Sequence, residues 1–312
     1  MADQTQAGTT APVEVRFGKR TQRFPSGELA ELRESQQLLG DVAALRQRMA
    51  EDGYLFLRGL VDRDKVAQAR QTILEHMHAH EALVPGTPLL EGAMPDGARS
   101  INLLGRAGVT HQEHVRAVFE GEELFNFWNA YFDRPALTFD YKWLRAVGNE
   151  EFTGAHYDVV YMGEGSGNLH TCWIPFGDIE PTQGTLAICV GSHAAPGFAR
   201  LRETYGRMDV DRDRVAGWFS DDPMEIVEKF GGQWATARFR MGDVLIFGMY
   251  TMHASTTNLT TRYRLSADVR FQPADDPVDR RWAGENPTGH DRWFSEPEKV
   301  KSMAECRRQW GV

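Results

Sequence analysis

The sequence predicts a β-rich α+β fold in which helices flank a double-stranded β-helix, the jelly-roll arrangement of two facing antiparallel sheets. Two observations carry this prediction. From residue 137 onward, short β-branched or aromatic segments alternate with Gly, Asp, Asn and Pro, a pattern typical of all-β sandwiches and barrels. Before that point, residues 27–51, 61–80 and 111–132 carry apolar side chains at helical spacing. We therefore expect most of the flanking helices to come from the first part of the chain.

The 312 residues are expected to form one main domain. Residues 1–13, rich in Thr, Ala, Gln and Gly, predict a disordered tail, and residues 14–312 the domain itself. A long mixed-charge stretch, about 194–240, interrupts the series of strands, and a C-terminal extension covers about 273–312. An insertion of this length inside a domain is usually a functional lid or carries its own helices.

Composition excludes several classes of function. The formal net charge of −9 gives no support for a nucleic-acid partner. No apolar run is long enough for a membrane span, and the first residues lack the apolar region of a secretory signal. The three cysteines lie far apart without a CxxC pair, which argues against a disulfide framework or a thiolate zinc site. We expect a cytoplasmic protein with a small-molecule substrate and no membrane or nucleic-acid partner.

The segment GAHYDVVYM, residues 154–162, contains a candidate pair of metal ligands. In a strand, His156 and Asp158 would point to the same side and Tyr157 to the other. Alone, such a pair is most often one polar, solvated strand face. A third ligand, His253, ends the apolar segment GDVLIFGMYTMHAS. Two histidines and a carboxylate leave open positions on an octahedral metal, which favours non-haem Fe(II), although zinc fits the same ligand types.

A second polar pattern follows in RYRLSADVRF, residues 262–271. Alternation places Arg264, Ser266, Asp268 and Arg270 on one face of a strand, with apolar side chains on the other. One interpretation is a half-buried strand with a solvated outer face. The other is that the polar face lines the barrel, where the guanidinium of Arg264 could bind a carboxylate through two hydrogen bonds.

These residues, in this order, resemble the phytanoyl-CoA dioxygenase family of Fe(II)- and 2-oxoglutarate-dependent oxygenases. Three longer stretches are similar to the N-terminal strand and helix, the central hairpin and the closing stretch of that family: EDGYLFLRGLVDRDKVAQAR, TCWIPFGDIEPTQGTLAICVGSH and HASTTNLTTRYRLSADVRF. Together they cover most of residues 50–272. The resemblance implies a cupin-like double-stranded β-helix and a single oxygenase domain.

The resemblance also implies roles for individual residues. His156, Asp158 and His253 would be the iron ligands. Arg264 would hold the distal carboxylate of 2-oxoglutarate, with Ser255 beside it and Trp173 near the co-substrate. Candidates for contact with the metal-chelating carboxylate are Lys142, Asn102 and Thr153. Candidates for contact with the substrate are Tyr157, Trp143, Arg145, Tyr161 and His170, of which Tyr161 is the weaker because a regular strand would turn it away from the ligands.

The implied reaction consumes O₂ and 2-oxoglutarate, releases succinate and CO₂, and hydroxylates a small organic molecule such as a secondary metabolite or a catabolic intermediate. Related enzymes that halogenate leave the carboxylate position empty for chloride, so the presence of Asp158 predicts oxygen insertion. Two alternatives remain open on the sequence. One is a jelly-roll metalloenzyme without oxygen chemistry, such as a zinc-dependent hydrolase or isomerase, and the other is a non-catalytic small-molecule binding protein.

Overall fold

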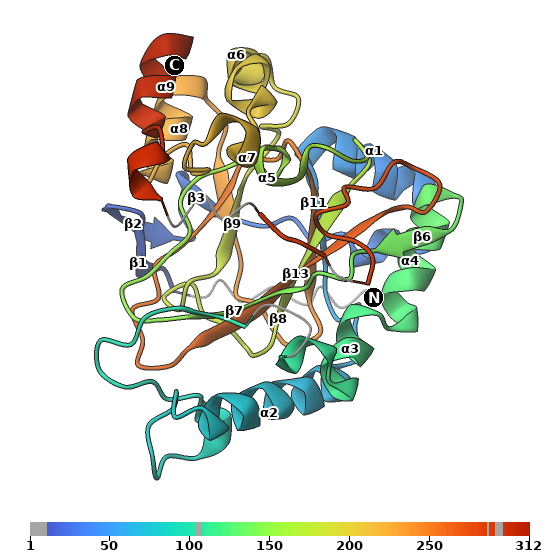
Figure 1. Cartoon of the computed structure of the whole chain (residues 1–312), viewed down its shortest axis with the longest axis vertical. Helices are drawn as coiled ribbons and strands as arrows, with labels where there is room; N and C mark the ends of the chain where they lie inside the picture. Colours follow the sequence, from blue (N-terminus) through green and yellow to red (C-terminus); the bar gives the residue numbers. More distant parts are fainter. Residues whose placement is uncertain (1–10, 104–107, 286, 291–295) are drawn as a thin grey trace, which may run out of the picture.

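The computed structural model describes residues 11–103, 108–285, 287–290 and 296–312. Two β-sheets face each other at its centre, and helices surround them (Figure 1). A cluster of buried side chains fills the space between the sheets: Tyr54, Phe56, Trp173, Leu245 and Phe247 come from one sheet, and Leu186, Ile188 and Ala235 from the other. The predicted jelly roll with flanking helices is therefore confirmed.

The larger sheet is built from antiparallel pairs only. Its strand order is β4-β11-β8-β13-β7-β5, and β6 pairs with β13 beyond β7. The strands are β4 (Tyr54–Leu57), β5 (Ile101–Asn102), β6 (Ala136–Thr138), β7 (Trp143–Val147), β8 (His170–Pro175), β11 (Val244–Gly248) and β13 (Arg264–Pro273). The long strand β13 lies between β8 and β7 and carries the polar alternation of residues 264–270 into the centre of the sheet.

The smaller sheet has the order β12-β9-β10-β3. Its strands are β3 (Leu29–Glu31), β9 (Leu186–Cys189), β10 (Trp234–Thr236) and β12 (His253–Ser255). Beside it lies an antiparallel hairpin formed by β1 (Val13–Phe17) and β2 (Arg20–Phe24). The strand β10 lies within the stretch that was predicted to be an insertion, about 194–240. The last part of that stretch therefore forms a strand of the smaller sheet. Residue 13 belongs to β1, while residues 1–10 of the predicted tail lie outside the described part.

Four helices cover the outer face of the larger sheet: α1 (Val42–Asp52), α2 (Arg63–Ala79), α3 (Glu113–Phe119) and α4 (Glu122–Phe132). The predictions of helix over 61–80 and 111–132 are confirmed, with a break at Gly121. The predicted helix over 27–51 is wrong in its first half. Leu29 is fully buried in β3 beside Trp234, and Asp41 caps the helix by accepting a hydrogen bond from the amide of Ala44, so α1 begins only at Val42.

A second group of helices packs beyond the smaller sheet: α6 (Ala199–Glu203), α7 (Val210–Asp213), α8 (Pro223–Phe230) and the C-terminal α9 (Met303–Trp310) (Figure 1). The short helix α5 (Val159–Met162) follows Asp158. Short 3₁₀ turns occupy Gln36–Leu38, Leu89–Glu91, Val109–His111, Pro196–Phe198, Tyr205–Arg207 and Pro297–Lys299. Within the described ranges, none of these helices has the length and apolar character needed to cross a membrane.

Candidate active site

The two histidines of the predicted triad meet across the edge of the smaller sheet. His156 and His253 form an antiparallel bridge, in which each backbone N–H donates to the other's carbonyl at 3.0 and 3.1 Å. The strand conformation then ends, and Asp158 adopts α-helical backbone angles at the start of α5. The prediction that strand alternation points His156 and Asp158 to the same side is therefore wrong in its reason. A tight turn after His156 brings the carboxylate of Asp158 back toward the imidazoles.

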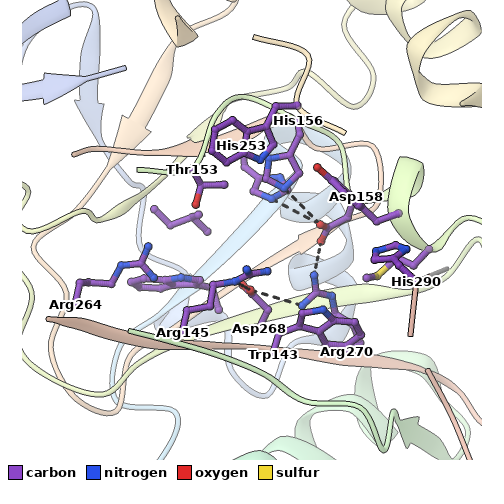
Figure 2. A pocket seen from close by; sticks show the side chains of 15 residues that line it. Trp143, Arg145, Thr153, His156, Asp158, His253, Arg264, Asp268, Arg270 and His290 are labelled. Carbon is purple, nitrogen blue, oxygen red and sulfur yellow. Dashed lines mark hydrogen bonds and ion pairs between the residues drawn. The ribbon is translucent and has the colours of Figure 1, made fainter. Parts of the chain in front are cut away.

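The ligand atoms converge on one point (Figure 2). The Nε2 atoms of His156 and His253 each lie 3.8 Å from Oδ1 of Asp158. Nδ1 of His156 donates to the carbonyl of Gly154 at 2.8 Å, and Nδ1 of His253 to the carbonyl of Thr251 at 3.0 Å. A carbonyl only accepts, so we assign the proton to Nδ1 in both rings. Both Nε2 lone pairs are then free for a metal ion.

The second carboxylate oxygen of Asp158 is held away from that point. Thr171 on β8 donates its hydroxyl to Oδ2 at 2.5 Å, and the guanidinium of Arg270 on β13 lies 3.3 Å from the same oxygen. Burial disfavours the charged carboxylate, but Arg270 and the two histidines together hold the pKa of Asp158 below its usual value. Burial, reinforced by His253, lowers the pKa of His156 to about 3. Two neutral imidazoles and one carboxylate fit a divalent metal.

Arg264 is the first residue of β13 and of its polar face, and it lies in the same cavity as the triad. Its side chain is 2% exposed, its guanidinium carbon lies 5.8 Å from the ring centre of Trp173, and it donates to the hydroxyl of Ser266. Nε of Arg264 is buried without a hydrogen-bond partner among the described residues. Burial lowers the pKa of Arg264 to about 10, so the group stays charged at neutral pH. A buried cation with an open donor fits a carboxylate such as that of 2-oxoglutarate.

A cavity of about 260 Å³ joins the triad to Arg264. Five of the sequence candidates line it in addition to these four: Trp143, Arg145, Thr153, Tyr161 and Trp173. Tyr161 reaches the cavity because α5 replaces the expected strand, and its ring centre lies 5.5 Å from that of His156. Of the polar face of β13, Asp268 and Arg270 also line the cavity, so the interpretation of an inward-facing strand is confirmed.

The other candidates lie outside the cavity lining. Lys142 is 1% exposed and contacts Glu120 and Thr138, at 3.2 and 3.3 Å, on the opposite side of β7 from Trp143. Asn102 lines a neighbouring groove. The hydroxyl of Ser255 is buried and accepts from the backbone N–H of Thr153 at 2.8 Å, so it supports the cavity wall from behind.

Two proposed substrate contacts also point elsewhere. Tyr157 is fully buried and stacks on Tyr205, with 5.6 Å between the ring centres. His170 packs against the helices, 5.1 Å from the ring of Trp128. Successive side chains of a strand alternate sides, so Thr171 faces Asp158 while His170 faces α4. Neither residue lies near the point where the ligands converge.

Sequence reasoning missed several residues of the site. Thr171, Met162, Leu186 and His290 had no motif to mark them, and His290 comes from the C-terminal extension. Trp218, an aromatic residue of the insertion at about 194–240, also lines the cavity. Gly154 permits this approach, because a Cβ at that position would lie 2.6 Å from the Trp218 ring. A glycine two residues before His156 was the available signal.

Comparison with known proteins places this geometry in a family. The model of the phytanoyl-CoA dioxygenase family matches residues 49–266. The chain belongs to this family. Among curated proteins, it is similar to 1-deoxypentalenic acid 11-beta-hydroxylase of Streptomyces arenae, with 29% identity over 76% of this chain and 83% of the relative. The enzyme of the same name from Streptomyces exfoliatus is 28% identical over the same shares of the two chains.

Solved structures show the same fold at lower identity. The epimerase SnoN from nogalamycin biosynthesis, in complex with Fe³⁺, alpha ketoglutarate and nogalamycin RO, superposes with a TM-score of 0.55 and 19% identity, covering 81% of this chain and 94% of that chain. EctD from S. alaskensis superposes with a TM-score of 0.54 and 17% identity, covering 89% of this chain and 94% of that chain. These likenesses concern the fold alone.

The family and the triad together settle the class of activity. The protein is an Fe(II)- and 2-oxoglutarate-dependent oxygenase of the phytanoyl-CoA dioxygenase family that acts on a small molecule. Of the three classes left open by the sequence, the oxygenase is therefore favoured over a zinc-dependent hydrolase or isomerase and over a non-catalytic binding protein.

Proposed function

We propose that the protein hydroxylates an unactivated C–H bond of a secondary metabolite or catabolic intermediate, with Fe(II) held by His156, Asp158 and His253. The convergence of two imidazole Nε2 atoms on one carboxylate oxygen, each 3.8 Å away, carries the proposal. Three ligands on one face of an octahedral metal leave positions for 2-oxoglutarate and O₂. The hydroxylase names of both curated relatives support the same reaction type.

When bound, Fe(II) with 2-oxoglutarate and O₂ supplies the oxidising power that breaks the C–H bond. The chain contributes position and shielding. In the proposal, Arg264 binds the distal carboxylate of 2-oxoglutarate, and Thr171 keeps one oxygen of Asp158 turned away from the metal. The apolar walls formed by Trp143 and Met162 orient the carbon skeleton of the substrate and keep water from the reacting bond.

The carboxylate of Asp158 argues against halogenation. Chloride would have to displace an anionic ligand whose second oxygen is already fixed by Thr171 and Arg270. We expect oxygen insertion without a chlorinated product. Once a substrate is known, mass spectrometry of the product formed under ¹⁸O₂ with chloride present checks this. A chlorinated product from the unmodified enzyme would contradict it, and an unlabelled product would point to desaturation or ring closure.

We further propose that the insertion at about 194–240 closes over the substrate through Trp218. The Trp218 side chain lines the cavity, is 41% exposed and stacks on Phe152, with 6.0 Å between the ring centres. Limited proteolysis of the Fe(II)–2-oxoglutarate form, with and without substrate, tests the closure. Protection of this stretch by substrate is expected, and equal cleavage in both states would remove the idea.

The direct test of the proposed chemistry needs no substrate. The protein reconstituted with Fe(II) under air, with ascorbate added as the two-electron reductant that takes the place of the substrate, should convert 2-oxoglutarate slowly to succinate and CO₂. The Asp158→Ala variant should lose this turnover while keeping its circular dichroism. Absence of succinate with the wild-type protein, or equal amounts from both proteins, would overturn the proposal.

A further inference from the structure

The cavity holds more positive charge than its described lining neutralises. Its charged side chains are three arginines and two aspartates: Arg145, Arg264, Arg270, Asp158 and Asp268. Fe(II) and the 2-oxoglutarate dianion carry charges of equal size and opposite sign, so binding both leaves the excess unchanged. A positive charge that is partly removed from water is costly unless an anion pairs with it.

The three arginines differ in the partners that they contact. Arg264 is assigned to 2-oxoglutarate by the proposed function. Arg270 is 4% exposed, contacts Oδ2 of Asp158 at 3.3 Å, and lies over the ring of Trp143 at 4.7 Å, so its direction is fixed from two sides. Its Nη1 lies 4.0 Å from Asp268. The Nε and Nη1 atoms of Arg270 are buried without hydrogen-bond partners among the described residues.

The guanidinium of Arg145 is held in place by one acidic partner and keeps nitrogen atoms available to bind an anion. It lies on β7 opposite Ser266 of β13, and its Nε donates to Oδ2 of Asp268 at 3.0 Å (Figure 2). That bond uses only one edge of the guanidinium. The structure gives its two terminal nitrogens no hydrogen bond to another described residue, and the side chain is 37% exposed and lines both the cavity and the neighbouring groove. Asp268 thus fixes the plane of the group and leaves its outer fork free for a carboxylate.

We propose that the substrate is a monocarboxylic acid with an apolar skeleton, and that Arg145, held by Asp268 and backed by Arg270, binds its carboxylate. This inference rests on the proposed function, because it takes the 2-oxoglutarate position at Arg264 as given. The rest of the lining suits the skeleton, since Met162 and Trp218 offer apolar surface. Arg145 is then the residue that selects an acid over its neutral analogue.

The guanidinium of Arg145 would bind the metal-chelating carboxylate of 2-oxoglutarate equally well. The following experiment distinguishes a substrate carboxylate from that of the co-substrate. The protein is loaded with Fe(II) and 2-oxoglutarate without O₂ and titrated with three probe acids, octanoate, cyclohexanecarboxylate and adamantane-1-carboxylate, each against its own primary amide. Tryptophan fluorescence reports binding of the probe. The visible absorption of the Fe(II)–2-oxoglutarate complex reports, in the same samples, whether the co-substrate is bound.

At least one acid should bind the wild-type protein about tenfold or more tightly than its amide, because a charge-assisted bidentate contact is lost in the amide. In Arg145→Gln the preference should vanish while the 2-oxoglutarate midpoint stays within about twofold, as expected when only the substrate contact is removed. Arg145→Lys keeps the charge and should retain part of the preference. Arg99→Gln is the matched control, since Arg99 is 87% exposed in the neighbouring groove and pairs with Glu151.

Three results would overturn the inference: equal binding of every acid and its amide, no binding of any acid, or an Arg145→Gln variant whose 2-oxoglutarate midpoint shifts in place of its acid preference. The last result would assign Arg145 to the co-substrate. If the wild-type protein with Fe(II) and 2-oxoglutarate never develops the absorption band, the proposed function itself is contradicted. Failure of this inference and failure of the proposed function are therefore distinguishable.

Discussion

At the scale of single residues, the carboxylate of Asp158 divides its oxygens between two tasks. Oδ1 faces the imidazoles at 3.8 Å, whereas Oδ2 accepts from Thr171 and Arg270. Such contacts to the far side of a ligand set its orientation, and their loss typically lowers metal affinity by about 10- to 100-fold. The hydroxyl of Thr171 is therefore expected to matter for iron although it would not touch the metal.

The first prediction follows from that hydroxyl. Thr171→Val should lower the affinity for Fe(II) by about tenfold or more, because Oδ2 loses its shortest hydrogen bond. Thr171→Ser keeps the donor and serves as the matched control, with affinity near wild type. Anaerobic equilibrium titration of Fe(II) measures both. Equal affinities in the valine and serine variants would show that Arg270 alone orients the carboxylate.

The second prediction concerns Arg264. Replacing it by Met should weaken 2-oxoglutarate binding by orders of magnitude, since removing one member of a buried charged pair costs about 3–5 kcal/mol. Arg262→Met is the control, because Arg262 is exposed two residues earlier on the same segment. The anaerobic absorption titration with 2-oxoglutarate gives both midpoints. An unchanged midpoint in Arg264→Met would place the anchor elsewhere.

Some of these residues were predictable and others were not, for physical reasons. The inward face of β13 was readable because strand alternation survives in a long, regular strand, and Arg264, Asp268 and Arg270 follow it. The position of Tyr161 was predicted wrongly because the chain turns into α5 at Asp158, and period-two reasoning fails at such a turn. His290 could not be found, since only tertiary packing brings the C-terminal extension to the cavity.

At the scale of elements, Arg281 connects the C-terminal extension to α7 through ion pairs. Arg281 lies 2.6 Å from Asp211, 2.7 Å from Asp279 and 3.3 Å from Asp209. Burial disfavours its charge, but the bonds to Asp279 and the other aspartates hold the pKa of Arg281 above its usual value. This contact positions the extension that carries Trp282 and His290 beside the cavity.

The third prediction tests this clamp. Arg281→Met should destabilise the folded protein by about 3 kcal/mol, because the fully buried Asp279 carboxylate loses its cationic partner. Arg280→Met, at the exposed neighbouring position, should change the unfolding free energy little. Urea unfolding compares the two variants. A result in which both behave alike would mean that apolar packing, and not Arg281, holds the extension.

The fourth prediction is a pH dependence from the contact between β8 and α4. Burial among the rings of Trp128, Tyr131 and Phe132 lowers the pKa of His170 to about 4. The unfolded chain, with a histidine pKa of about 6.5, then binds the proton more readily between these two values. The contribution of His170 to stability is therefore complete above the unfolded pKa and is lost as pH falls toward about 4.

His170→Gln should remove that contribution. The free-energy difference between wild type and variant should shrink or change sign, by an amount on the order of 1 kcal/mol, when unfolding is measured at about pH 5 instead of about pH 7. His114→Gln, at an exposed position of α3, is the control for general histidine effects. A wild-type-to-variant difference independent of pH would show that the ring titrates equally in the folded and unfolded chain.

At the scale of the whole molecule, the sequence predicted the two-sheet architecture better than it predicted which strands pair with each other. Short strands with turn residues between them indicated two facing sheets, and both sheets are present. Which strands pair was not predictable from local pattern. His156 and His253 meet because β12 pairs with β9 at the sheet edge and the segment before α5 joins beyond it. Contacts between such distant residues depend on the global fold, and only the order of motifs in a family revealed them.

The proposed chemistry requires one metal centre, formed by His156, Asp158 and His253 at the edge of the smaller sheet. Its most direct test is anaerobic titration of Fe(II) and 2-oxoglutarate into the wild-type protein and His253→Ala, with bound iron and visible absorption measured on the same samples. We predict that the wild-type chain binds a single Fe(II) and develops the absorption of an Fe(II)–2-oxoglutarate complex, and that the folded variant does neither. Equal iron binding and equal absorption in His253→Ala would contradict the central claim.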